Sequence, residues 1–179
     1  MKKYGLFLKI FTIVIFSISS CKKDKDDHLE RWMIANITAF SAIKANPEYK
    51  ELASPGNEGS IYYKVLHSGD GTDTIRYTSS VSCYYKGYFA VDFPDYNIKA
   101  GTVFDQRLFD NGPPAHFTVA GVVSGWKTAL QHMVKGDKWE IWVPYQLGYG
   151  RADSGNSIPG YSTLVFELEI VNITGVDNL

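Results

Sequence analysis

The sequence has little cysteine: Cys21 and Cys83 are the only two in 179 residues. Cys21 stands where a lipid could be attached, so lipidation would leave only Cys83 and would exclude an intrachain disulfide. Cys83 lies in a stretch of alternating apolar and polar residues, which is typical of a strand. It is therefore expected to be a small buried hydrophobe and not a nucleophile.

Residues with the spacing of a metal or phosphate site are also missing. The four histidines are scattered along the chain without ligand spacing: His28, His67, His116 and His132. The segment Gly69-Asp70-Gly71 lacks the Lys-Ser/Thr pair of a phosphate-binding loop. We therefore expect no metal and no organic cofactor.

Charge of one sign is not in excess. The chain has 18 basic and 19 acidic residues, a formal net charge of −1 at pH 7. Removing residues 1–20 deletes three lysines and no acid, which leaves 15 basic against 19 acidic residues, or −4. This balance does not indicate a nucleic-acid partner.

No apolar run is long enough to span a bilayer. Lys2 and Lys3 precede a mainly apolar run, Leu6–Ile18, and together they predict a secretory signal peptide over residues 1–20. Ser19-Ser20-Cys21 then resembles a relaxed lipobox, so Cys21 is expected to become the lipidated first residue of a bacterial lipoprotein and to hold it at a membrane. The alternative is ordinary cleavage that leaves Cys21 as an unmodified thiol.

The segment after Cys21, residues 22–27, is a mixed run of lysine and aspartate without an apolar residue. Most such runs are solvated linkers. A mixed Lys/Asp run behind a lipidated cysteine also resembles the surface-export signals of some Gram-negative lipoproteins. The expected location is the cell envelope, lipid-anchored at the outer membrane and facing the periplasm or the cell surface.

Aromatic residues, by contrast, are abundant: 15% of the chain, with 12 Tyr, 10 Phe and 4 Trp. This content favours a sheet with an aromatic-lined pocket, although Tyr and Trp also simply fill small β cores.

The stretch 122–150 predicts a short helix, a turn, a strand and an aromatic loop. Ser124 is expected as the N-cap of the helix, and Gly136 as the left-handed residue of the turn after it. The apolar face of the helix recurs at helical spacing in Trp126, Ala129, Leu130 and Met133. In the strand, Trp139, Ile141 and Val143 alternate with Lys138, Glu140 and Trp142.

The flanking sequence predicts a helix from His28 onward that breaks at Asn46-Pro47, with a shorter helix through Leu52. Residues 54–59 are expected to form a loop at a domain boundary. Further strands are expected at 61–66, 75–89 and 163–173. The predicted fold is α+β, with an antiparallel twisted sheet wrapped around one short helix and preceded by a helical segment.

Five motifs occur in a fixed order: Val122-Val123-Ser124-Gly125-Trp126, then Gly136, then Leu147-Gly148-Tyr149-Gly150, then Ile158-Pro159, then Leu164-Val165-Phe166. In this order and spacing the sequence resembles the FKBP-type peptidyl-prolyl cis-trans isomerases over about residues 60–173. Together with the amino-terminal pattern and the loop at 54–59, the resemblance predicts three parts: a signal peptide at 1–20, a lipidated tether and helical segment at 21–58, and an isomerase domain at 59–179.

Three departures from the family pattern bear on the site. Residues 88–103 lengthen the connection that the family usually makes with a short hairpin. Gly160 stands where a second proline is common, and Ala115 stands where many relatives have an aromatic residue, which is expected to open one wall of the pocket.

The resemblance also implies the site residues. Catalytic roles fall on Tyr85, Phe104, Asp105 and Tyr149. Substrate-binding roles fall on Phe117, Val122, Val123, Trp126, Ile158 and Phe166. On composition alone several of these residues are equally well explained as plain core.

The implied function is acceleration of X–Pro bond rotation in extracytoplasmic proteins, by binding the twisted amide in an aromatic pocket. The implied partners are proline-containing polypeptides and inhibitors of the tacrolimus and rapamycin type. The alternative is a non-catalytic, chaperone-like peptide-binding lipoprotein on the same fold.

Overall fold

A computed structural model describes residues 18–92, 99–155 and 157–175, with the backbone alone for 18–26. Most of the predicted signal peptide, the side chain of Cys21 and residues 93–98 of the insertion lie outside the described part. Over the described residues, no helix is both long enough and apolar enough to cross a membrane.

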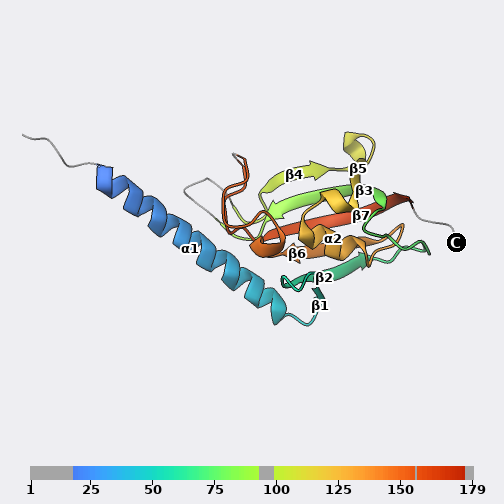
Figure 1. Cartoon of the computed structure of the whole chain (residues 1–179), viewed down its shortest axis with the longest axis horizontal. Coiled ribbons are helices and arrows are strands. Elements are labelled where there is room, and N and C mark those ends of the chain that lie inside the picture. Colours follow the sequence, from blue (N-terminus) through green and yellow to red (C-terminus); the bar gives the residue numbers. More distant parts are fainter. Residues whose placement is uncertain (1–17, 93–98, 156, 176–179) are drawn as a thin grey trace, which may run out of the picture.

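The described residues form one antiparallel sheet and two α-helices (Figure 1). The strand order is β1-β2-β6-β7-β3-β4, and β5 lies beside the first half of β3. The strands are β1 Lys50–Ala53, β2 Ser60–His67, β3 Ser80–Phe89, β4 Val103–Arg107, β5 Ala115–Thr118, β6 Lys138–Val143 and β7 Leu164–Thr174. The helices are α1 Ile18–Lys44 and α2 Ser124–Leu130, with 3-10 turns η2 Phe109–Asn111, η3 Val119–Gly121 and η4 Tyr145–Leu147.

Helix α2 lies across one face of the sheet, and α1 projects past the sheet at its amino-terminal end (Figure 1). The core fills the space between α2 and the sheet. All four residues predicted to be apolar contacts are buried: Trp126, Ala129 and Leu130 on α2, and Met133 three residues beyond the end of the helix, which is shorter than the predicted spacing implied. The α+β sheet around a short helix is confirmed as well.

The predicted strand periodicity holds at the centre of the sheet. Trp139, Ile141 and Val143 are buried in β6, while the residues between them are half-buried. Cys83 in β3 is also buried, as expected, and burial raises the pKa of its thiol to about 12.

The short helix expected through Leu52 is wrong, because β1 occupies that segment and pairs with β2. Helix α1 instead extends backward to Ile18, since residues 18–44 contain no proline or glycine to interrupt it. The loop 54–59 joins β1 to β2, so the first strand of the sheet precedes the predicted boundary at residue 58. That boundary stays a prediction.

Two local predictions also need correction. The strand expected from residue 75 begins only at Ser80, because a backbone hydrogen bond from Ser79 to the carbonyl of Arg76 closes a turn before it. Ser124 is the first residue of α2 and not its N-cap. The cap is Val123, whose carbonyl accepts from the Lys127 amide at 3.1 Å.

Candidate active site

A cavity of about 230 Å³ opens between α2 and the strands β3, β4, β5 and β7. Its lining is mainly aromatic and aliphatic, with one carboxylate. The lining residues are Tyr85, Phe104, Asp105, Phe117, Gly121, Val122, Val123, Trp126, Tyr149 and Phe166. They come from distant parts of the chain, so only the folded sheet brings them together.

The indole of Trp126 forms the floor of the cavity. It is 5% exposed, and three rings meet it edge-on: Tyr85 at 5.3 Å, Phe117 at 5.5 Å and Phe166 at 5.3 Å between centroids. Edge-to-face contacts of this kind fix ring orientation as well as position. The Trp126 Nε1 is buried and has no hydrogen-bond partner in the described part of the chain.

Phe104 and Phe166 form one wall, with their rings edge to face at 5.5 Å. Behind them, Gly87 of β3 leaves the space that both rings need. A Cβ at residue 87 would lie 2.7 Å from Phe104 Cζ and 2.8 Å from Phe166 Cε1. The absence of a side chain at Gly87 therefore allows Phe104 and Phe166 to pack against β3.

Polar groups gather at the rim of the cavity. The Tyr85 hydroxyl donates to Asp105 Oδ2 at 2.8 Å. Burial raises the pKa of Tyr85 above its usual range, and the hydrogen bond to Asp105 adds to the rise. Tyr149 is 45% exposed, and its pKa is also raised, first by burial and then by the charge of Asp105. Both hydroxyls thus remain protonated donors at neutral pH.

The aliphatic side of the cavity is the entrance to α2. Val122 directly follows η3 and Val123 is the N-cap of α2, so the first amides of α2 begin beside the cavity. Such amides lack partners within their own helix and are available to a carbonyl oxygen.

Nine of the ten residues predicted for the pocket line this cavity. The exception is Ile158, which is 8% exposed and forms a backbone bridge with Ser154. Ala115 is not among the lining residues either. Gly121 was missed, although its place just before Val122 in the sequence was a usable signal.

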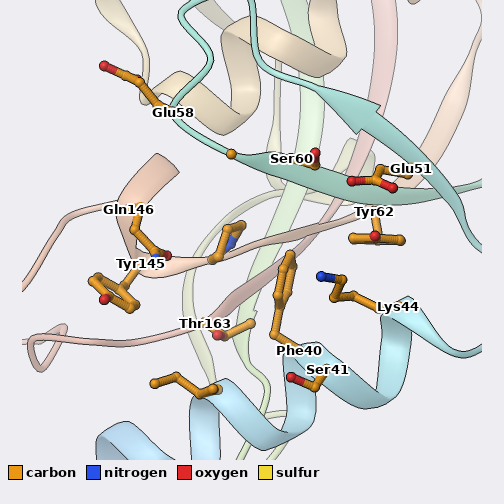
Figure 2. A pocket seen from close by; sticks show the side chains of 13 residues that line it. Phe40, Ser41, Lys44, Glu51, Glu58, Ser60, Tyr62, Tyr145, Gln146 and Thr163 are labelled. Carbon is orange, nitrogen blue, oxygen red and sulfur yellow. The ribbon is translucent and has the colours of Figure 1, made fainter.

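A second cavity, of about 340 Å³, lies between α1 and the β1–β2 hairpin (Figure 2). Phe40 rises from α1 toward Tyr62 of β2, and their rings meet edge to face at 5.5 Å. Lys44, Glu51 and Glu58 add charges of both signs around it. None of the predicted site residues lines this cavity.

Across the described ranges, no group of three or more histidine, cysteine or acidic side chains could hold a metal ion. What the first cavity offers is a rigid aromatic floor, apolar walls and hydroxyl donors at its mouth. That arrangement suits the binding of a small apolar ring attached to a polar amide.

Comparison with known proteins gives a consistent picture. The model of the family described as "FKBP-type peptidyl-prolyl cis-trans isomerase" matches residues 71–171. The FKBP-type 22 kDa peptidyl-prolyl cis-trans isomerase of Escherichia coli is 40% identical over 150 residues, which cover 84% of this chain and 68% of that protein.

Two further proteins extend the comparison. The Outer membrane protein MIP of Legionella longbeachae is 31% identical over 145 residues, covering 75% of this chain and 51% of that protein. The crystal structure of a peptidyl-prolyl cis-trans isomerase from Pseudomonas syringae pv. tomato superposes with a TM-score of 0.64 at 33% identity. It covers 80% of this chain and 94% of the other.

Proposed function

This chain belongs to the FKBP-type peptidyl-prolyl cis-trans isomerases, and we propose that the cavity above Trp126 is where it binds and rotates the X–Pro bond. The observation that carries the proposal is the convergence of nine predicted residues on one aromatic cavity. Family membership favours catalysis over the alternative of peptide binding without turnover.

The chemistry needs neither a nucleophile nor a metal. Rotation about a peptide bond meets a barrier of about 18–20 kcal/mol, because resonance gives the C–N bond partial double-bond character. The twisted amide has lost that resonance and carries less charge on its carbonyl oxygen. An apolar cavity that excludes water therefore favours the twisted amide over the planar, dipolar one. Every ~1.4 kcal/mol of such preference gives a tenfold rate increase.

We propose the following roles for the main groups that line the cavity. The proline ring sits on the Trp126 indole, between the wall of Phe104 and Phe166 and the aliphatic side of Val122. The Tyr149 hydroxyl and the Val123 amide donate to carbonyl oxygens of the substrate backbone. Asp105, held by the Tyr85 hydroxyl at 2.8 Å, orients the polar part of the twisting amide.

Ile158 keeps its proposed role as a substrate contact. It is buried and does not border the cavity, so this contact would require the segment around it to approach when the substrate binds.

The test is an isomerase assay on the full chain with a proline-containing tetrapeptide, with and without rapamycin. We expect a rate above the uncatalysed background that rapamycin abolishes by occupying the cavity. Folded protein without such a rate would reject catalysis, and a rate insensitive to rapamycin would place catalysis elsewhere.

We further propose that the protein works in the cell envelope, held by a lipid on Cys21. The signal-like residues 1–20 and the Ser19-Ser20-Cys21 sequence support this location. The name of the Legionella relative, an outer membrane protein, is consistent with it. The expected substrates are proline-containing chains outside the cytoplasm.

A further inference from the structure

Helix α1 lies outside the residues that the family model matches, yet two of its side chains are buried against the isomerase fold. Trp32 is 2% exposed and Asn36 is 0% exposed, whereas Ile34 between them is 53% exposed. A buried amide side chain needs hydrogen-bond partners. The Asn36 Nδ2 donates to the Trp32 carbonyl of α1 itself at 2.9 Å. The partners of Asn36 Oδ1 and of the Trp32 indole lie in the rim segment, residues 149–155 and 157–163, between Tyr149 of the cavity and the start of β7.

Hydrogen bonds fasten the far end of the rim segment to α1. The Trp32 Nε1 donates to the Gly160 carbonyl at 3.0 Å, and the Thr163 amide donates to Asn36 Oδ1 at 2.6 Å. The Thr163 hydroxyl donates to the Asn36 carbonyl at 3.2 Å. Figure 2 shows Thr163 beside Phe40, next to the ribbon of α1.

The two attachments flank a residue in an unfavourable backbone conformation. Tyr161 has a φ of 64°, in the left-handed region that bulky residues rarely adopt. Such a conformation persists only where the surrounding structure holds it. The Tyr161 amide in turn donates to the Gly150 carbonyl at 2.9 Å, directly after Tyr149. The hydrogen bonds from α1 to Gly160 and Thr163 therefore also restrain Gly150 and, next to it, Tyr149.

A second route joins α1 to the wall of the cavity. The Trp32 ring meets Phe89 edge-on at 6.2 Å, and Phe89 packs on Phe104 at 5.1 Å. Phe104 contacts Phe166, which contacts the Trp126 floor. The aromatic packing is therefore continuous from the helix to the floor.

We propose that Trp32 and Asn36 are positioning residues of the isomerase site, and that α1 is part of the catalytic unit and not only a tether. Through Gly160 and Thr163 they fix the rim segment that carries Tyr149. Through Phe89 the Trp32 ring supports the Phe104 wall. This inference rests on the proposed location of the isomerase site.

The test compares three full-length variants. Trp32→Phe keeps a ring against Phe89 and removes the donor to Gly160. Asn36→Ala removes the acceptor for the Thr163 amide, and Ile34→Ala is the control on the exposed side of the same helix. Each is assayed for kcat and KM with the proline tetrapeptide, and its amide hydrogen exchange is followed at Tyr161 and in β6 and β7.

We expect Trp32→Phe and Asn36→Ala to lower kcat/KM at least fivefold and to speed exchange of the Tyr161 amide at least tenfold. Exchange in β6 and β7 should stay unchanged, since the amides of these strands are bonded within the sheet and not to α1 or the rim segment. Ile34→Ala should match the unmodified protein in every measurement.

The inference is overturned if both variants keep kcat/KM within twofold of the unmodified protein. It is also overturned if exchange in β6 and β7 rises together with that of Tyr161, because the effect is then a general loss of stability. Should Asn36→Ala fail to fold, Trp32→Phe decides the question. A folded unmodified protein without isomerase activity would reject the proposed function instead.

Discussion

The hydrogen bond between the Tyr85 hydroxyl and Asp105 joins two strands at the mouth of the cavity. Since Asp105 is exposed, its charge is not needed to hold the fold together. We expect the Asp105 carboxylate instead to orient the Tyr85 hydroxyl and to interact with the substrate amide beside the apolar wall.

Replacing Asp105 should therefore reduce activity more than stability. We expect Asp105→Leu to lower kcat/KM about tenfold, equivalent to about 1.4 kcal/mol of transition-state stabilisation. Asp105→Asn, which keeps an acceptor for the Tyr85 hydroxyl, should lose less. The tetrapeptide assay measures both, with Asp110→Asn as a control at an exposed site outside the cavity. Equal activity in Asp105→Leu and the unmodified protein would remove Asp105 from the mechanism.

Titratable residues whose pKa is raised by burial predict how stability changes at high pH. Burial raises the pKa of Cys83 to about 12, and the pKa values of Tyr85 and Tyr88 are raised as well. Each of these groups has a higher pKa in the folded protein than in the unfolded chain. Its contribution to the free energy of unfolding is complete below the unfolded pKa and is lost as the pH rises from there through the folded pKa. The loss should begin near pH 9, the ordinary value for Cys83, and steepen above pH 10, the ordinary value for the tyrosines.

Urea unfolding at intervals from pH 8 to 11.5 measures this loss. Cys83→Ala should abolish the decline between pH 9 and 10 and leave the steeper part above pH 10. A midpoint that stays constant to pH 11 would contradict the expectation for both kinds of group.

At the scale of elements, α2 can lie close to the sheet because Gly125 has no side chain. A Cβ there would lie 2.5 Å from Val143 Cγ1 and 2.8 Å from Val143 Cγ2, in the middle of the core. Alanine is normally better than glycine inside a helix by about 1 kcal/mol. Here the clash outweighs that gain, since overpacking a core costs about 1–3 kcal/mol.

We therefore expect Gly125→Ala to lower the free energy of unfolding by about 1–3 kcal/mol, measured by urea denaturation. The double variant with Val143→Ala should be less destabilised than the sum of the two single variants, because the second change removes both clashing methyl groups. Additive effects would show that α2 shifts as a whole and that the methyl groups are not the obstacle.

At the scale of the whole molecule, α1 leads from Cys21 to the sheet as one uninterrupted helix. If Cys21 is lipidated, the anchor lies at one end of that helix, while Trp32 and Asn36 lie about 16–23 Å along its axis at 1.5 Å per residue. The helix would then hold the isomerase domain at a defined distance from the membrane.

Lipidation predicts that labelled palmitate is incorporated by the full-length protein and not by Cys21→Ala. The same substitution should move the protein from the membrane fraction to the soluble fraction, because the acyl chains that supply membrane affinity are lost. Equal labelling of the two proteins would reject the anchor.

The sequence by itself determined those helices and strands whose apolar residues recur at a regular spacing. Helical spacing predicted the buried face of α2, and alternation predicted β6, because burial on one face requires an apolar residue at every turn or every second position. Of the nine predicted residues that line the cavity, the ordered motifs contain five, Val122, Val123, Trp126, Tyr149 and Phe166, and the wider family resemblance supplied the other four.

Only the tertiary structure decided the rest. Lys50–Ala53 is a strand because β2 is beside it, and no local pattern reports that neighbour. Trp32 and Asn36 bond residues 128 and 127 positions away, so the helix predicted from His28 onward did not show what these two side chains contact. Such contacts depend on where the whole chain places the rim segment, and local propensity carries no information about that placement.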